Sequence, residues 1–486
     1  MRLRTLHSVD RPSLAVAVGL AALVLAWIAQ PIDGGDTGPL TAGTEQLADC
    51  LAELDLVSCE QRTPIGAYPV LQYAPDLVAH AGLRLSEGTR RALLSVLSGI
   101  GVAAAVAAAW LVLRRVGAHE WRWGFLLVVL SGPVLAYGSA TWGEMLATGL
   151  LTMFVAGALL QARPWLLGVA AFAASVTKET SYPFVAALGV VALLIARRRT
   201  GEPIRRHVLA GGLGVAAALA LTGAFNVLRF GTPRNAYYLD PALRTSTVSW
   251  FFELTAGLFV SPNGGILVFW PTASLLLALL LAVPVVRAFG REVSWNVAWP
   301  APALAAIAAC ITLGLAAWWA PFGWWAWGPR LTLPWVLPIV LVALAAFGPM
   351  LTPWVARTLS SRPAFILVAG LLVAVALPHI GYVWRPETLS DFFFTPESAV
   401  CPGGGPPPTP AYYACLREEL WTRHPIWLDA LEGLKTFGGL ATALGVAAAV
   451  LGSLALLRRN TIARVGRLRT VSTRRGRRAR REPSGR

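Results

Sequence analysis

Apolar runs separated by short polar stretches repeat along almost the whole chain. A helix needs about 20 apolar residues to cross the hydrocarbon core of a bilayer, so this pattern predicts about twelve transmembrane helices. The expected spans lie near residues 13–30, 93–113, 123–138, 142–161, 164–177, 182–196, 208–227, 264–286, 296–317, 331–348, 363–380 and 436–457. The fourth to sixth are the weakest, because some are short and Lys178 and Glu179 interrupt them, so eleven or thirteen spans stay open.

Composition agrees with this pattern. The 486 residues are 56% hydrophobic and only 14% charged, with a mean hydropathy of +0.60, whereas soluble domains carry about 25% charged residues. The sequence therefore predicts an all-α polytopic membrane protein with one continuous membrane domain over residues 1–457. The first apolar run is not followed by a small-residue cleavage site, so we expect a retained helix rather than a signal peptide.

Arginine residues favour one orientation of this membrane domain. Cytoplasmic loops are enriched in lysine and arginine, and here the arginines fall in alternate loops and at both termini: Arg2, Arg4, Arg11, Arg114, Arg115, Arg122, Arg197, Arg198, Arg199, Arg205, Arg206, Arg287, Arg291, Arg357 and Arg362. We therefore expect a multi-pass protein of the cell membrane with both termini in the cytoplasm. Three long segments, near residues 31–91, 229–263 and 381–435, would then lie outside.

The net charge of +16 is concentrated in the C-terminal tail. Residues 458–486 contain twelve arginines and a single acidic residue, Glu482. Such a basic cytoplasmic tail is expected to be disordered and to be attracted to anionic lipid. Membrane lipid is thus the expected partner rather than nucleic acid, and a contact with nucleic acid or the ribosome is the alternative.

Four of the five cysteines lie in the predicted outer segments, where disulfides persist. Cys50 and Cys59 lie in the first segment, and Cys401 and Cys415 lie in the third. Pairing within each segment is the simplest of the three possible connectivities. Their spacing is not typical of a zinc site, and we expect no metal site here. Cys310, inside a predicted span, is expected to be a small core residue.

Several charged residues lie near the predicted outer ends of spans, where burial is costly and charge often marks function. They are Asp33, Asp36, Glu144, Lys178, Glu179 and Arg330. Each also has a structural interpretation. Asp33 and Asp36 would be ordinary loop carboxylates, and Glu144 a carboxylate favoured by the helix dipole. Lys178 and Glu179 would be a charged loop pair, and Arg330 an arginine beside an interfacial belt of tryptophans. His80, His379 and His424 are isolated, so we expect them to be hydrogen-bonded or exposed to solvent rather than metal ligands.

The order of these features resembles the GT-C class of integral membrane glycosyltransferases, in the group related to the protein mannosyltransferases and the aminoarabinose transferase. The resemblance rests on a series of short motifs that follow the first span. They are the Asp33–Asp36 loop, Tyr68–Pro75, Thr141–Glu144, Thr177–Thr180, Leu258–Gly265 and Trp327–Arg330. It implies a GT-C-like bundle that transfers a sugar from a polyprenyl-phosphate donor to a glycan, lipid or protein acceptor on the extracytoplasmic face.

The resemblance also implies roles for the charged residues. Asp33 or Asp36 would be the general base; where members of the class carry adjacent acidic residues, or an aspartate followed by an aromatic one, this chain reads Asp-Gly-Gly-Asp. The remaining candidates bind the substrates: Lys178 and Arg330, then Arg229 and Arg234, for the phosphate, and Glu144 and Glu179 for orienting the acceptor or these cations. Transfer would be inverting and would require no cofactor, with a dependence on divalent metal left open.

Two non-enzymatic functions are the alternatives: a transporter or flippase of lipid-linked glycans, and a catalytically silent membrane scaffold. A transporter tends to carry its ionisable groups in mid-span, on broken helices of repeated halves. This sequence shows no internal repeat, and its ionisable groups lie toward one face. The distribution of charge therefore favours the glycosyltransferase.

Overall fold

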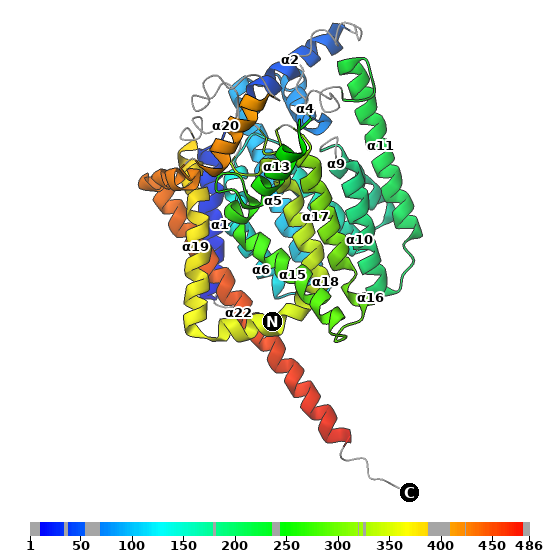
Figure 1. The fold of residues 1–486 in the computed structure, drawn as a ribbon, viewed down its shortest axis with the longest axis vertical. Helices are drawn as coiled ribbons and strands as arrows, with labels where there is room; N and C mark the ends of the chain where they lie inside the picture. Colours follow the sequence, from blue (N-terminus) through cyan, green and yellow to red (C-terminus); the bar gives the residue numbers. More distant parts are fainter. Residues whose placement is uncertain are drawn as a thin grey trace, which may run out of the picture.

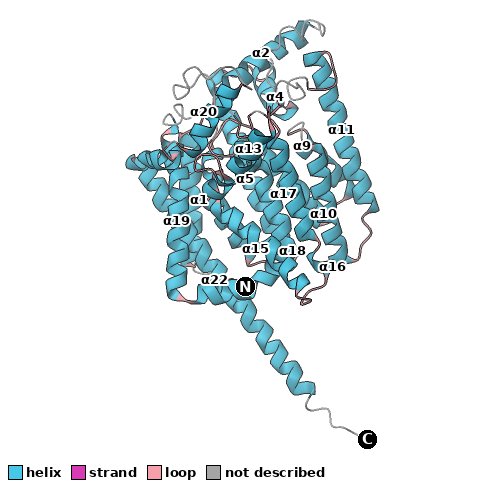
Figure 2. Cartoon of the chain, viewed as in Figure 1, coloured by secondary structure: helices cyan, strands magenta, loops and turns pink. Residues whose placement is uncertain are grey.

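The computed structural model describes residues 10–33, 37–53, 69–177, 181–235, 244–318, 320–323, 327–386, 409–422 and 424–479. Within these ranges the fold is all-α, and only two isolated β-bridges occur (Figure 2). The helices are α1 (Arg11–Ala29), α2 (Thr37–Glu53), α4 (Val70–Leu77), α5 (Glu87–Arg115), α6 (Trp121–Leu130), α7 (Val134–Tyr137), α8 (Glu144–Leu159), α9 (Pro164–Ser175), α10 (Tyr182–Thr200), α11 (Arg205–Phe230), α13 (Val248–Val260), α14 (Ile266–Phe269), α15 (Pro271–Phe289), α16 (Trp295–Ala298), α17 (Pro300–Ala316), α18 (Leu333–Ser360), α19 (Arg362–Trp384), α20 (Pro410–Trp421), α21 (Ile426–Asp429) and α22 (Phe437–Ala479).

Each predicted span coincides with one helix or with two consecutive helices. Eight helices of the described chain are long and apolar enough to cross a membrane. The predicted spans at 123–138, 142–161 and 164–177 fall on the shorter helices α6 with α7, α8 and α9, and the span at 182–196 falls on α10, whose last turn is arginine-rich. The structure thus confirms a multi-helix membrane protein, and twelve as the number of spans stays a prediction.

The bundle is built around α18. Its apolar stretch is 89% buried inside the protein, against 17–39% for α5, α11, α15, α17 and α19. The first and last helices, α1 and α22, pack side by side, and a Cβ atom at Gly19 would lie only 2.2 Å from the carbonyl oxygen of Gly445. Small residues let helix backbones approach this closely in membranes.

Helices α2, α4, α13 and α20 gather at one end of the bundle, whereas α16 and the C-terminal part of α22 lie at the other (Figure 1). The predicted second and third outer segments are joined at the first of these ends. The Asn263 side chain donates a hydrogen bond to the Glu419 carbonyl at 2.8 Å and accepts one from the Ile426 N–H at 2.9 Å. Arg417 also forms an ion pair of 2.8 Å with Glu253.

Two expectations differ from the structure. Cys310 is exposed on α17 rather than buried in the core; a helix that is apolar on every face gives no signal of which side faces lipid. The tail is helical as far as Ala479, although disorder was predicted from residue 458. Adding a residue to an existing helix is easier than starting a new one, so α22 continues into the basic segment.

Candidate active site

The predicted charged residues Glu144 and Arg330 form a buried ion pair. Glu144 is the first residue of α8, where the helix dipole favours a negative charge. Its Oε1 lies 3.4 Å from the Arg330 Nε, and both side chains are less than 10% exposed. The Arg330 guanidinium also lies over the indole ring of Trp142, 5.0 Å from the ring centroid. Residues 186 positions apart are thus brought into one charged cluster.

Two glycines let the chain bring Arg330 to this place. Gly328 has φ +68° and Gly323 has φ +81°, both in the left-handed region that favours glycine. A Cβ atom at Gly328 would lie 2.6 Å from the Phe269 ring, and one at Gly323 would lie 2.8 Å from the Arg330 Nε. The backbone at both positions therefore leaves no room for a larger residue.

The predicted Asp-Gly-Gly-Asp loop is attached to the same Thr-Trp-Gly-Glu segment. The Ile32 N–H donates to the Ser139 carbonyl at 2.9 Å, and the Thr141 N–H donates to the Ile32 carbonyl at 3.1 Å. On the other side of the loop, the Thr37 hydroxyl lies 2.6 Å from the Thr141 hydroxyl. The residues that flank the loop therefore converge on the start of α8, whereas Asp36 lies outside the described residues.

Asp33 is held by an arginine that the sequence did not single out. The Asp33 Oδ2 lies 3.2 Å from Arg91 Nη1, and Arg91 also pairs with Glu87 on the same helix, α5. The Asp33 side chain is 43% exposed, so it is open to an incoming molecule. An exposed pair of this kind contributes about 1 kcal/mol or less to stability, which makes orientation of the aspartate its main effect.

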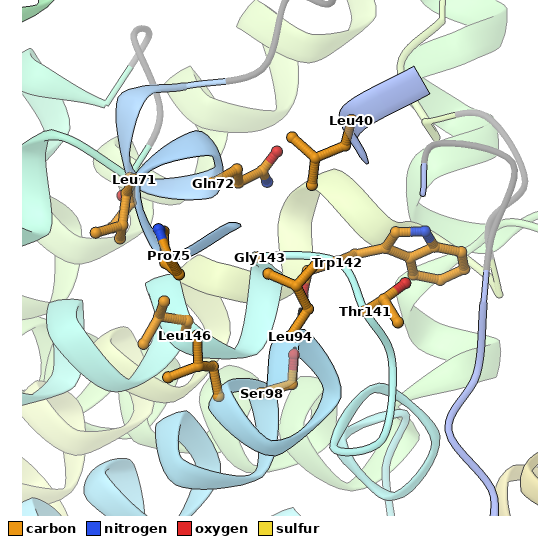
Figure 3. A pocket seen from close by; sticks show the side chains of 12 residues that line it. Leu40, Leu71, Gln72, Pro75, Leu94, Ser98, Thr141, Trp142, Gly143 and Leu146 are labelled. Atoms are coloured by element: carbon orange, nitrogen blue, oxygen red, sulfur yellow. Dashed lines mark hydrogen bonds between the residues drawn. The ribbon is translucent and has the colours of Figure 1, made fainter. Parts of the chain in front are cut away.

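A narrow pocket lies beside this cluster, between α2, α4, α5 and α8. Leu40 of α2 and Gln72 of α4 approach from one side, and Leu94 and Ser98 of α5 approach from the other (Figure 3). Trp142 also lines it. The cavity volume is about 20 Å³, which is room for about one water molecule. A sugar therefore fits here only if the lining side chains move.

Helix α2, which covers this pocket, is anchored by buried charges. Arg90 of α5 donates to the Glu45 Oε1 at 2.6 Å, and its Nε lies 3.5 Å from the Asp76 carboxylate. Burial raises the pKa of Asp76, although the nearby Thr44 hydroxyl and the Arg90 charge oppose this effect. Arg90 thus links α2, α4 and α5 on the outer side of the pocket.

No family model and no curated protein matches the chain. Two solved structures do, both of ArnT from Cupriavidus metallidurans, one in the apo state and one bound to undecaprenyl phosphate. The matches cover 92% of this chain and 77% of ArnT, with identities of 18% and 17% and TM-scores of 0.44 and 0.43. The chain is similar to ArnT. This resemblance concerns the arrangement of helices alone.

The remaining predicted phosphate-binding residues lie in other surroundings. Arg229 is buried, donates to the Asn226 side chain at 2.6 Å, and packs over the rings of Phe225 and Tyr73. Those contacts tie α11 to α4. Arg234 is exposed in the turn after α11. The phosphate-binding roles of both arginines stay predictions.

Lys178 and Glu179 lie outside the described residues, and Thr177, just before them, lines the pocket. Cys50 and Cys415 are disulfide-bonded. Their predicted partners, Cys59 and Cys401, are also outside the described residues, so the connectivity stays a prediction. Among the described residues, no group of three or more histidine, cysteine or acidic residues is placed to hold a metal ion.

Proposed function

We propose that the protein transfers a sugar from a polyprenyl-phosphate donor to an acceptor at the end of the bundle that carries α2, α4 and α20. The observation that carries this proposal is the convergence on one short segment, Thr141–Glu144. The flanks of the Asp-Gly-Gly-Asp loop hydrogen-bond there, and Glu144 pairs there with Arg330. This convergence supports a site that combines a base from the loop with a cation, as such a transfer requires.

The proposed reaction is a single inverting displacement. A carboxylate of the loop, from Asp33 or Asp36, accepts the proton of the acceptor hydroxyl while its oxygen attacks the anomeric carbon. The bond from that carbon to the phosphate oxygen breaks, and the lipid phosphate leaves with the electron pair. Arg330 balances the charge that develops on the phosphate, which a guanidinium can bind through two hydrogen bonds. This step needs no covalent intermediate and no cofactor.

A donor carried by lipid suits the position of the site. The pocket beside the charged cluster is lined by residues of α2 and α4, which lie at one end of the bundle (Figure 1), and several of the lining side chains are leucines. By the distribution of arginines, this end faces the outside of the cell membrane. A phosphate held at the interface there keeps its polyprenyl chain in the bilayer while the sugar reaches the acceptor.

The experiment compares membranes containing wild type, Asp33→Asn and Asp36→Asn, each supplied with a panel of radiolabelled polyprenyl-phosphate sugars. Wild type is expected to transfer label from one donor, and the variant that lacks the base is expected to lose roughly 100-fold or more of that activity. Asp429→Asn, a partly exposed carboxylate in α21, is the matched control and should retain activity. The absence of transfer from every donor would contradict the proposal, and a flippase assay in proteoliposomes would then test the transport alternative.

A further inference from the structure

Trp327, three residues before Arg330, is fixed at its backbone by a single side chain. Its ring and backbone are completely buried. The Trp327 N–H donates to the Tyr137 hydroxyl at 2.9 Å, and that hydroxyl donates to the Trp327 carbonyl at 3.2 Å. One hydroxyl of α7 therefore satisfies both polar groups of this residue's backbone, and it does so in a place where unpaired groups cost about 1–3 kcal/mol each.

The Trp327 side chain is held by His379 of α19. The indole Nε1 donates to the His379 Nδ1 at 2.8 Å, and because an indole N–H can only donate, this Nδ1 is unprotonated. The ring of Trp327 stacks on Tyr382, with centroids 4.8 Å apart and planes 3° from parallel. The histidine therefore has a defined tautomer and a defined partner.

This contact fixes the residue from which a short link leads to Arg330. Only Gly328 and Pro329 separate Trp327 from Arg330, and the restricted φ of proline stiffens this link. Phe269 contacts the Trp327 ring edge-on at 5.1 Å and would collide with any side chain at residue 328. A shift of the indole would therefore move the guanidinium away from Glu144.

We infer that His379 is a positioning residue for sugar transfer, acting through Trp327 to hold Arg330 where the lipid phosphate departs. This inference rests on the proposed function. It assigns a role to a histidine that touches neither the base nor Arg330 in the structure. Since misplacement of a catalytic group by about 1 Å can cost 10²-fold in rate, the histidine acts on turnover without contacting substrate.

The test compares His379→Leu with His379→Asn. Leucine leaves the buried indole N–H without an acceptor, whereas asparagine offers its Oδ1 near the place of Nδ1. We expect His379→Leu to lower kcat by 10- to 100-fold with the acceptor KM unchanged, and His379→Asn to recover most of that loss. Tyr137→Phe, which keeps the ring and removes only the hydroxyl bound to Trp327, should lower kcat in the same way if His379→Leu fails to fold.

A second measurement separates the failure of this inference from that of the proposed function. Undecaprenyl phosphate binding to purified protein is measured for wild type, His379→Leu and His379→Asn, with His424→Leu, at an exposed histidine, as the control. A roughly tenfold weaker affinity in His379→Leu, restored in His379→Asn, supports the inference without requiring transfer. If His379→Leu has the same kcat and affinity as wild type, the inference about His379 is overturned while the proposed sugar transfer stands. If the wild-type protein neither transfers sugar nor binds the lipid phosphate, the inference and the proposed function are both overturned.

Discussion

Arg330 and Glu144 are both almost completely buried, and the ion pair between them compensates part of the charge of each. Removing one partner of a buried pair leaves the other uncompensated and costs about 3–5 kcal/mol. A phosphate that reaches Arg330 supplies an alternative negative partner of higher charge. The same arginine is then suited to stabilise the empty site and to bind the departing group.

The pair therefore predicts different defects for two conservative changes. Arg330→Lys keeps the charge but loses the planar fork that binds phosphate through two hydrogen bonds, so transfer should fall on the order of 100-fold with a small loss of stability. Glu144→Gln keeps the shape but removes the negative charge that faces Arg330, so the apparent Tm should fall more than in Arg330→Lys. Transfer assays and thermal unfolding of the same preparations measure both effects, and equal Tm values for the two variants would contradict the buried-pair argument.

At the scale of a residue, local sequence pointed to Glu144 and Arg330 but not to what holds them. Both lie in short motifs with charge at a span end, a signal visible without a structure. Tyr137 looks like one more apolar position of a span, and its hydroxyl gains meaning only beside Trp327, 190 residues later. The sequence likewise gives no sign that residue 323 must be glycine, because the space for a side chain there is taken by the Arg330 guanidinium.

At the scale of helices, α2 is attached to its neighbours through a charged cluster. The Asp76 carboxylate beneath it is completely buried and faces Arg90, with Glu45 and His80 acting on it through longer-range electrostatics. Burial raises the Asp76 pKa above its ordinary value of 3.8, so the folded state binds this proton more tightly than the unfolded state does. Its contribution to stability is therefore full below pH 3.8 and is lost as pH rises through the raised pKa.

This linkage predicts that α2 opens more readily as pH increases from 4 toward neutrality. Hydrogen exchange of the α2 amides, measured at several pH values and corrected for the intrinsic exchange rate, should show declining protection over that range. Asp76→Asn, which is neutral at every pH, should flatten the profile, and Asp429→Asn should leave it unchanged. Protection that rises with pH in wild type would refute the sign of the effect.

The elements themselves were largely predictable, because long apolar runs must form helices in a bilayer, where every backbone polar group needs an internal partner. The breaks within the predicted spans were harder to predict. The predicted span at 123–138 is split after Leu130, where Gly132 and Pro133 break the helix and Trp270 donates to the Val128 carbonyl. The contact at this break comes from Trp270, just before α15, and the periodicity within the span cannot reveal that contact.

At the scale of the whole molecule, the two ends of the bundle differ in chemistry. Basic segments far apart in sequence contact one another or neighbouring turns at the end opposite the site. Arg464 donates to the Gly117 carbonyl and contacts the buried Glu120, and Arg198 lies over the Trp299 ring. The charge pattern that predicted cytoplasmic loops is therefore gathered on one side, away from the Asp33 loop and Arg330.

This separation gives a direct test of orientation. Helix α11 joins the two ends, with exposed Glu202 just before it and exposed Thr232 just after it. In a Cys310→Ser background, a membrane-impermeant maleimide added to intact cells should label Thr232→Cys but should label Glu202→Cys only after permeabilisation. The background protein without added cysteine measures residual labelling of the outer cysteines. The opposite result would place the Asp33 and Arg330 end in the cytoplasm, and transfer to an extracytoplasmic acceptor would then have no access to the site.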